Sequence, residues 1–389
     1  MTHHRRGFSL IELVVAMALT STVLACLLAL LRPAQDAFAV QPEIADMQQR
    51  LRIAGDALTA SLSGAGAGAY LAGHTGPLIR FFAPVLPFRQ SLSSDDAPGT
   101  MRTDAITVIA VPATAAQTTL AGPLAPGDLT LQVVPEAGCS VGTNLCGFSV
   151  GLTIALFDDT GTFGVFTIAE VDDALARITL TARPADSSAT TYRSGSNVLE
   201  VRLDTFALKT DVAAQAFQLM HGDGSARADV PLADHVVGLT FDYYAEPRPP
   251  TLESGAASYG PVPPPVGVRT SGYPPGENCA FQIDPFSGEP TTRLSILAPG
   301  TALVPLNAAQ LTDGPWCPDE ADANRWDADL LRIRTIGVTL RVEVASAALR
   351  GPARVLFAHP GSSTSPNRSA PDLEMQFRVS PRNLGVGRR

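Results

Sequence analysis

Residues 8–31 read FSLIELVVAMALTSTVLACLLALL, and Glu12 is the only charged residue among them. As a helix this run would be about 36 Å long, which is enough to cross a hydrocarbon layer of about 30 Å. Arg5 and Arg6 precede it, so the positive-inside rule places the N-terminus in the cytoplasm and sends the following chain outward. The run predicts one membrane-spanning helix at the start of an exported protein.

Glu12 is the unusual residue of this run, because a carboxylate inside a membrane helix costs free energy unless it has a partner or reaches the interface. Two interpretations stay open. Glu12 can extend unpaired to the cytoplasmic headgroups. Alternatively, a cut between Gly7 and Phe8 would create an α-amino group one helical turn away. The amine of one subunit would then neutralise the carboxylate of its neighbour in an assembly.

The leader MTHHRRG (residues 1–7), followed by Phe8-Ser9-Leu10-Ile11-Glu12-Leu13 and the long apolar run, resembles the class III signal of type IV prepilins. The resemblance implies that prepilin peptidase cuts after Gly7 and methylates the new N-terminal residue, Phe8. It also implies that Glu12 sets the registration of subunits during assembly. An ordinary secretory signal fits less well, since the apolar run is long and no A-x-A site ends it.

Residues 32–68 predict a second, periplasmic part of the helix. Pro33 and Pro42 lead us to expect kinks or fraying after the apolar run. Beyond them, apolar residues recur at three- and four-residue steps, which indicates an amphipathic helix that ends in the glycine-rich segment 64–68. The members of this stripe are Ile44, Met47, Leu51, Ala54, Leu58 and Leu62. The segment resembles minor pilins of the PilW type and the J-type pseudopilins of type II secretion.

Residues 69–389 predict a β-rich periplasmic head with a proline-rich insertion at about 245–330. The sequence DDTG at 158–161 indicates a hairpin turn. The expected fold class is α+β and pilin-like: a long N-terminal helix, first transmembrane and then amphipathic, packed on an antiparallel β-rich head with long loop insertions. The expected strands are 104–111, 129–134, 152–157, 163–171, 177–181, 197–203, 236–244, 333–344, 354–358 and 373–379.

Five cysteines are present. Cys26 lies in the apolar run and behaves there as a small hydrophobe. If the head is exported, Cys139–Cys146 and Cys279–Cys317 are the natural disulfides, although four cysteines allow three connectivities. Free or metal-binding thiols are the alternative, but neither spacing is that of a CxxC zinc pair.

The sequence contains no Walker or dinucleotide-binding motif, and no two histidines have metal-ligand spacing. The pattern GxSxG occurs at 138–142 and 147–151, but neither match is followed by a predicted helix, which the nucleophile elbow of a hydrolase requires. We therefore expect no catalytic residues, no cofactor and no metal, and the net charge of −9 argues against a nucleic-acid partner. One group of acidic residues offers oxygen atoms to calcium but lacks the spacing of a calcium loop. It comprises Asp313, Asp319, Glu320, Asp322, Asp327 and Asp329.

The sequence predicts a non-enzymatic minor pilin, processed by prepilin peptidase and assembled with other minor and major pilins into a type IV pilus. A head that spans 69–389 is bulky for a closely repeated subunit, which favours the tip or the initiation complex. The expected location is the inner membrane, single-pass, and then the filament. A pseudopilin of type II secretion is the alternative. A periplasmic enzyme or binding protein on an uncleaved signal anchor is the alternative of another class.

Overall fold

The computed structural model describes residues 9–68, 76–88, 102–136, 139–140, 142–181, 191–211, 216–223, 229–252, 259–268, 273–311, 328–350 and 370–385. The chain divides into two compact units. The first comprises Met1–Arg50 and Glu343–Leu373, and the second comprises Leu51–Val342 and Glu374–Arg389. The expected strand at 354–358 lies outside the described residues, as do Cys317 and most of the acidic group of the insertion.

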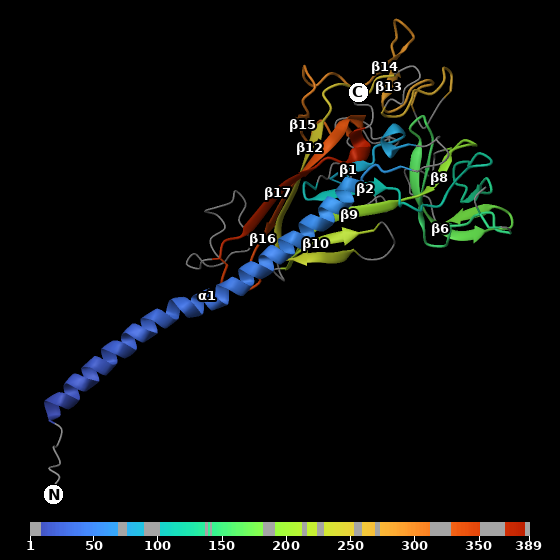
Figure 1. Ribbon diagram of the computed structural model, residues 1–389. Helices are drawn as coiled ribbons and strands as arrows, with labels where there is room; N and C mark the ends of the chain where they lie inside the picture. Colours follow the sequence, from blue (N-terminus) through green and yellow to red (C-terminus); the bar gives the residue numbers. More distant parts are fainter. Residues whose placement is uncertain are drawn as a thin grey trace. The chain divides into compact units, whose positions relative to one another are not determined.

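The long N-terminal helix α1 runs from Leu10 to Gly64 as one element (Figure 1). The fraying that we expected at Pro33 and Pro42 does not occur, because helical residues continue through both positions. Each proline removes one backbone donor at a cost of about 3 kcal/mol. Helix α1 has 55 residues, and the residues before and after each proline remain helical.

Within the first unit, Glu43 of α1 holds the segment that begins at Glu343. Its Oε2 accepts hydrogen bonds from the backbone N–H groups of Ala345 (3.1 Å) and Ser346 (3.4 Å). The same segment contains a buried ion pair, in which Nη1 of Arg350 lies 3.3 Å from Oε1 of Glu343. Backbone amides and a buried charge pair therefore fix this segment.

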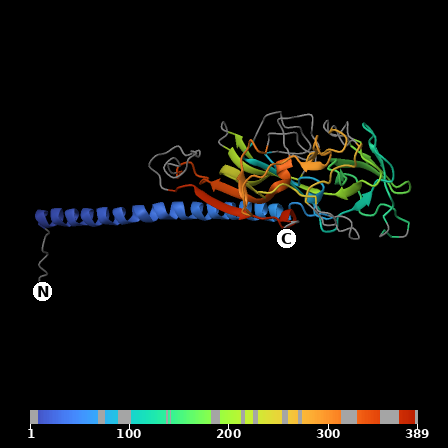
Figure 2. The ribbon, with the colours of Figure 1, turned by 90° about the horizontal axis from the view of Figure 1, so that it is seen from above.

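The C-terminal part of α1 belongs to the second unit and buries the apolar stripe expected from the sequence. Leu51, Ala54, Leu58 and Leu62 are all buried. A Cβ at Gly55 would overlap the methyl group of Met375, so this glycine allows strand β17 (Leu373–Val379) to lie close to the helix. Figure 2 shows the two elements side by side. The stripe predicted for the second half of the helix is confirmed here.

The helix ends as predicted in the glycine-rich segment. Gly66 has φ of +75°, a conformation that stops a helix and favours glycine. Its N–H donates to the carbonyl of Ile109 at 2.9 Å, which ties the helix end to strand β2 (Ala105–Ala110).

Two antiparallel sheets form the part of the second unit that lies beside α1. The first has the order β1-β2-β9-β10-β11 and the second has the order β15-β12-β16-β17. Strand β12 also lies against β2, β9 and β10, which joins the two sheets. The bounds not yet given are β1 Val85–Pro87, β9 Arg202–Asp211, β10 Ala216–Gly222, β11 Val230–Asp234, β12 Val236–Ala245, β15 Val304–Leu306 and β16 Ile333–Val342.

A third antiparallel sheet lies between β2 and β9 in the sequence, with the order β3-β8-β5-β6-β7-β4. Its edge strands meet, because Leu120 pairs with Val133 and the N–H of Val134 donates to the carbonyl of Thr119 at 2.9 Å. These contacts close the sheet into a small barrel with its own apolar core. The bounds are β3 Gln117–Thr119, β4 Thr130–Gln132, β5 Thr153–Phe157, β6 Phe163–Asp172, β7 Arg177–Leu180 and β8 Asn197–Glu200.

Most expected strands are present, with shifted ends. The turn at 158–161 connects β5 and β6, and Gly161 there has φ of +98°. The expected strand 197–203 is wrong as one element: it covers β8 and the start of β9, which belong to different sheets. Strands β1, β3, β10, β11 and β15 and most of β9 were not anticipated.

The insertion at 245–330 is mostly irregular in its described part, yet it contains the hairpin of β13 (Phe281–Ile283) and β14 (Pro290–Thr292). Arg332 anchors it. Its side chain is 1% exposed and donates to the carbonyls of Glu246 (3.1 Å), Pro247 (2.9 Å) and Ser295 (3.0 Å), besides pairing with Asp329 at 2.8 Å. One buried guanidinium therefore connects the insertion to the start of β16.

Candidate functional site

The N-terminal part of α1 is the region where the sequence places function. Leu10–Leu30 has a mean hydropathy of 2.5, and none of this span is buried. By length and composition it can cross a membrane. Its hydroxyl groups are satisfied within the helix, because Thr20, Ser21 and Thr22 each donate to the carbonyl four residues earlier at 2.8 Å. The helix thus exposes an apolar surface without unpaired hydroxyl donors at these three positions.

Ser9 and Glu12 form a capping box at the start of this helix. The N–H of Ser9 donates to Oε2 of Glu12 at 2.9 Å, and the N–H of Ile11 donates to Oγ of Ser9 at 3.1 Å. Two of the backbone donors left over at a helix N-terminus are satisfied in this way. The Ser-x-x-Glu spacing was visible in the sequence, but we did not assign Ser9 a role from it.

The capping box adds a third interpretation for Glu12, alongside the unpaired carboxylate and the contact with a neighbouring subunit. A carboxylate offers about four lone-pair sites, so capping its own helix leaves capacity for an ammonium group. Gly7 and Phe8, the residues on either side of the expected cut, lie outside the described residues.

The disulfide in the barrel joins Cys139 and Cys146, with Cα atoms 5.4 Å apart. Oε2 of Glu136 lies 3.7 Å from Sγ of Cys139 and 3.6 Å from Sγ of Cys146, and burial raises the pKa of this carboxyl. These three residues are the one group of potential metal ligands among the described residues. With the two sulfur atoms in a disulfide, however, the group offers no thiolate to a metal.

Cys279 is buried and disulfide-bonded. Its expected partner, Cys317, lies outside the described residues, so the pairing Cys279–Cys317 stays a prediction. Cys26 is free and exposed on α1.

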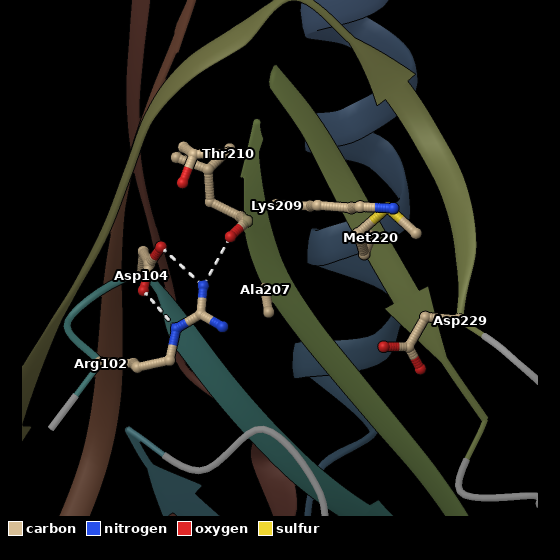
Figure 3. A pocket seen from close by; sticks show the side chains of 8 residues that line it. Arg102, Asp104, Ala207, Lys209, Thr210, Met220 and Asp229 are labelled. Atoms are coloured by element: carbon tan, nitrogen blue, oxygen red, sulfur yellow. Dashed lines mark hydrogen bonds and ion pairs between the residues drawn. The ribbon is translucent and has the colours of Figure 1, made fainter. Parts of the chain in front are cut away.

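A cavity of about 740 Å³ opens on the five-stranded sheet (Figure 3). Arg102 crosses it and pairs with both carboxylate oxygens of Asp104 at 3.1 and 3.0 Å, while also donating to the carbonyl of Leu208 at 2.5 Å. Lys209 and Asp229 also line the cavity. The described lining contains no serine, cysteine or histidine.

Asp204 and His221 form a polar pair on the same sheet. Nε2 of His221 lies 3.0 Å from Oδ1 of the buried Asp204, and Nε of Arg202 donates to Oδ2 at 2.8 Å. Burial raises the pKa of Asp204, but the hydrogen bond from His221 and the charge of Arg202 outweigh it, so the pKa is lowered. This hydrogen bond joins strands β9 and β10.

Of the acidic group considered for calcium, Asp329 is the one described member, and it is paired with Arg332. The other five members lie outside the described residues, so the calcium hypothesis is not tested.

Comparison with known proteins identifies the N-terminal segment. Residues 2–27 match the family described as prokaryotic N-terminal methylation motif. No curated protein sequence matches the chain. Among solved structures, a type IV-like pilin from Thermus thermophilus is similar, with 12% identity over 61% of this chain and 87% of that chain. Its TM-score is 0.16, so this likeness carries no argument about the fold.

The chain carries an N-terminal methylation motif, and in its described part a long N-terminal helix precedes an antiparallel β-rich head. The motif implies processing by prepilin peptidase, and the apolar helix implies membrane anchoring before assembly.

Proposed function

We propose that this protein is a minor pilin, cut by prepilin peptidase between Gly7 and Phe8, methylated on Phe8, and assembled at low copy into a type IV pilus. The observation that carries the proposal is the methylation motif at residues 2–27, which runs directly into an exposed helix of mean hydropathy 2.5. A helix of this kind is stable either in lipid or against the helices of other subunits.

The second step of the proposal concerns Glu12. Once the membrane helices of several subunits pack together, water and headgroups are excluded, and an unpaired carboxylate becomes expensive. The amine of a neighbouring Phe8 offsets that cost, while the capping box holds the Glu12 side chain at the N-terminus of α1. Charge pairing would thereby select the correct axial position of each subunit.

The head favours a low-copy position. Its described part contains four antiparallel sheets, one of them the β13–β14 hairpin of the proline-rich insertion. A subunit repeated closely along a filament needs a slimmer head. We therefore place the subunit at the tip or in the initiation complex, and we assign it to the PilW type on the phrase DMQQRL at 46–51 and the segments 234–241 and 377–383.

Mass spectrometry of the N-terminus from the membrane fraction tests the processing step. The expected N-terminal residue is methylated Phe8. A chain that still begins at Met1 in cells with active prepilin peptidase would contradict the proposal and favour a signal-anchored enzyme or binding protein.

A set of three variants separates the two roles of Glu12. Glu12→Gln keeps the capping box, because glutamine also serves at this position, but it removes the charge. Glu12→Ala removes both, and Ser9→Ala removes part of the cap and keeps the charge. If amine pairing drives assembly, all three are processed, Glu12→Gln and Glu12→Ala lose incorporation into the sheared filament fraction, and Ser9→Ala retains it. Normal incorporation of Glu12→Gln would leave capping as the only role.

A further inference from the structure

Phe286 lies in the turn between β13 and β14, and its side chain is 98% exposed. Among the described residues, no other large apolar side chain is more exposed. Figure 1 shows the two labelled strands at the periphery of the head. A single exposed apolar residue is ordinary on a protein surface, so the meaning of Phe286 depends on how the turn holds it.

The turn is fixed by Asp284. Its Oδ1 accepts hydrogen bonds from the N–H groups of Phe286 (2.7 Å) and Ser287 (2.9 Å), and its carbonyl accepts one from Gly288 at 2.8 Å. Gly288 has φ of +73°, which glycine adopts without strain. Asp284 N–H also donates to the carbonyl of Glu289 at 3.0 Å. The backbone of Phe286 is therefore set before any partner arrives.

The base of the hairpin is also fixed. Nδ2 of the buried Asn278 donates to the carbonyls of Thr160 (2.9 Å) and Val262 (2.7 Å), which connects the hairpin to the turn of the barrel. Arg293, just beyond β14, pairs with Glu277 at 2.6 Å and lies over the ring of Tyr273 at 5.1 Å. Because the turn and the base of the hairpin are both fixed, its backbone loses little conformational entropy on binding a partner. Preorganised binding elements gain affinity in this way.

The charge around Phe286 restricts what it can bind. Asp284 and Glu289 flank it, and the hydrogen bonds from Ser287 and Phe286 lower the pKa of Asp284, so this carboxyl stays ionised. An acidic tip is repelled by anionic lipid headgroups. It is also repelled by a second copy of this chain, whose net charge is −9. An apolar pocket with a basic rim is complementary to it.

We propose that the β13–β14 hairpin is a protein-binding element in which Phe286 inserts into an apolar pocket, rimmed by arginine or lysine, on a partner protein. Aromatic anchors of this kind supply most of the affinity of many interfaces, while rim charges adjust rate and specificity. The inference does not depend on the role of the N-terminus.

Photo-crosslinking of the full chain in its own cells tests the proposal. Phe286 is replaced by p-benzoylphenylalanine, and Ile296, which is 68% exposed in the same insertion, receives the same residue as the matched control. We expect position 286 to form an adduct with one protein, with a yield at least about ten times that of position 296. Peptide mapping should place the adduct in an apolar pocket beside arginine or lysine.

A charge variant and a binding assay with phosphatidylglycerol vesicles complete the test. Glu289→Gln should lower the yield from position 286 several-fold at low salt and have a smaller effect at high salt. N-terminal methylation, read in the same samples, reports on the proposed function separately. The proposal is overturned by any of four results: no protein adduct, equal yields at 286 and 296, an adduct on an acidic surface or on a second copy, or Phe286-dependent binding to phosphatidylglycerol vesicles.

Discussion

Replacing Arg332 by methionine should destabilise the second unit more than any single surface charge change. The side chain is 1% exposed, and its partners are the Asp329 carboxylate and three backbone carbonyls of the insertion. Methionine has a similar length but no donors. The change removes this ion pair from the buried Asp329 and removes the donors from carbonyls that are partly or fully withdrawn from water.

The expected loss is about 3–5 kcal/mol, which is the usual cost of removing one partner from a buried ion pair. The melting temperature should fall by about 5–8 °C, at about 1.5 °C for each kcal/mol in a unit of about 300 residues. Urea denaturation of the full chain in detergent, followed by tryptophan fluorescence, measures the free energy directly.

The matched control is Arg177→Met. Arg177 also pairs with an aspartate, Asp172, at a similar distance of 2.9 Å, but the two side chains are 43% and 34% exposed. Exposed pairs contribute about 0–1 kcal/mol. If the two variants lost equal stability, or Arg332→Met lost less than about 1 kcal/mol, burial would not be the reason that Arg332 matters.

Two further changes test the barrel. Burial raises the pKa of Asp158 against the hydrogen bonds from Thr160 and Thr162, so its contribution to stability grows as pH falls through the folded pKa and is lost as pH rises. Asp158→Asn keeps the accepting oxygen and should be at least as stable as the wild type at pH 7. Towards pH 4 the stability of the wild type should increase relative to that of the variant. Urea denaturation curves at both pH values measure the two free energies of unfolding. The double change Cys139→Ser and Cys146→Ser opens a loop with a sequence separation of 7 and should cost about 2.5 kcal/mol by the same assay, and no loss would show that the loop is held without its disulfide.

Local patterns predicted the local elements well. The buried stripe of Leu51, Ala54, Leu58 and Leu62 follows from helical periodicity, and strand 373–379 has the predicted bounds. The turn at 158–161 follows from its residues, because Oδ1 of Asp158 accepts a hydrogen bond from the N–H of Thr160 and Gly161 supplies a positive φ.

Long-range pairing could not be predicted in the same way. The contact between Leu120 and Val133 that closes the barrel depends on the register between two strands of three residues each, and the alternation within one strand does not reveal which strand it pairs with. Residues 197–203 look like one strand because their hydrophobicity is continuous, yet Val201 separates strands of two different sheets.

The functional residues likewise divide into those that a local sequence pattern reveals and those that depend on contacts between distant residues. The motif at residues 2–27 is linear, so the sequence was sufficient to find it. The burial of Arg332 was not visible, since its three backbone acceptors lie about 40 to 90 residues away in the chain. The exposed position of Phe286 likewise depends on a turn held by hydrogen bonds to Asp284, which the structure shows and the sequence does not.

The chain leaves the five-stranded sheet to form the barrel and returns to that sheet at the same place. Ala110, the last residue of β2, pairs directly with Arg202, the first residue of β9, and the chain from 111 to 201 departs and returns between them. Paired residues of antiparallel strands are about 5 Å apart, a gap that a short hairpin turn can also bridge. The barrel is therefore an inserted module whose two ends lie at one point of the sheet. It also contacts its surroundings, because Asn278 bonds to the carbonyl of Thr160 and the ring of Phe163 stacks on that of Phe82 at 4.3 Å. A domain grafted at this point needs two ends about 5 Å apart and a surface that covers Phe82.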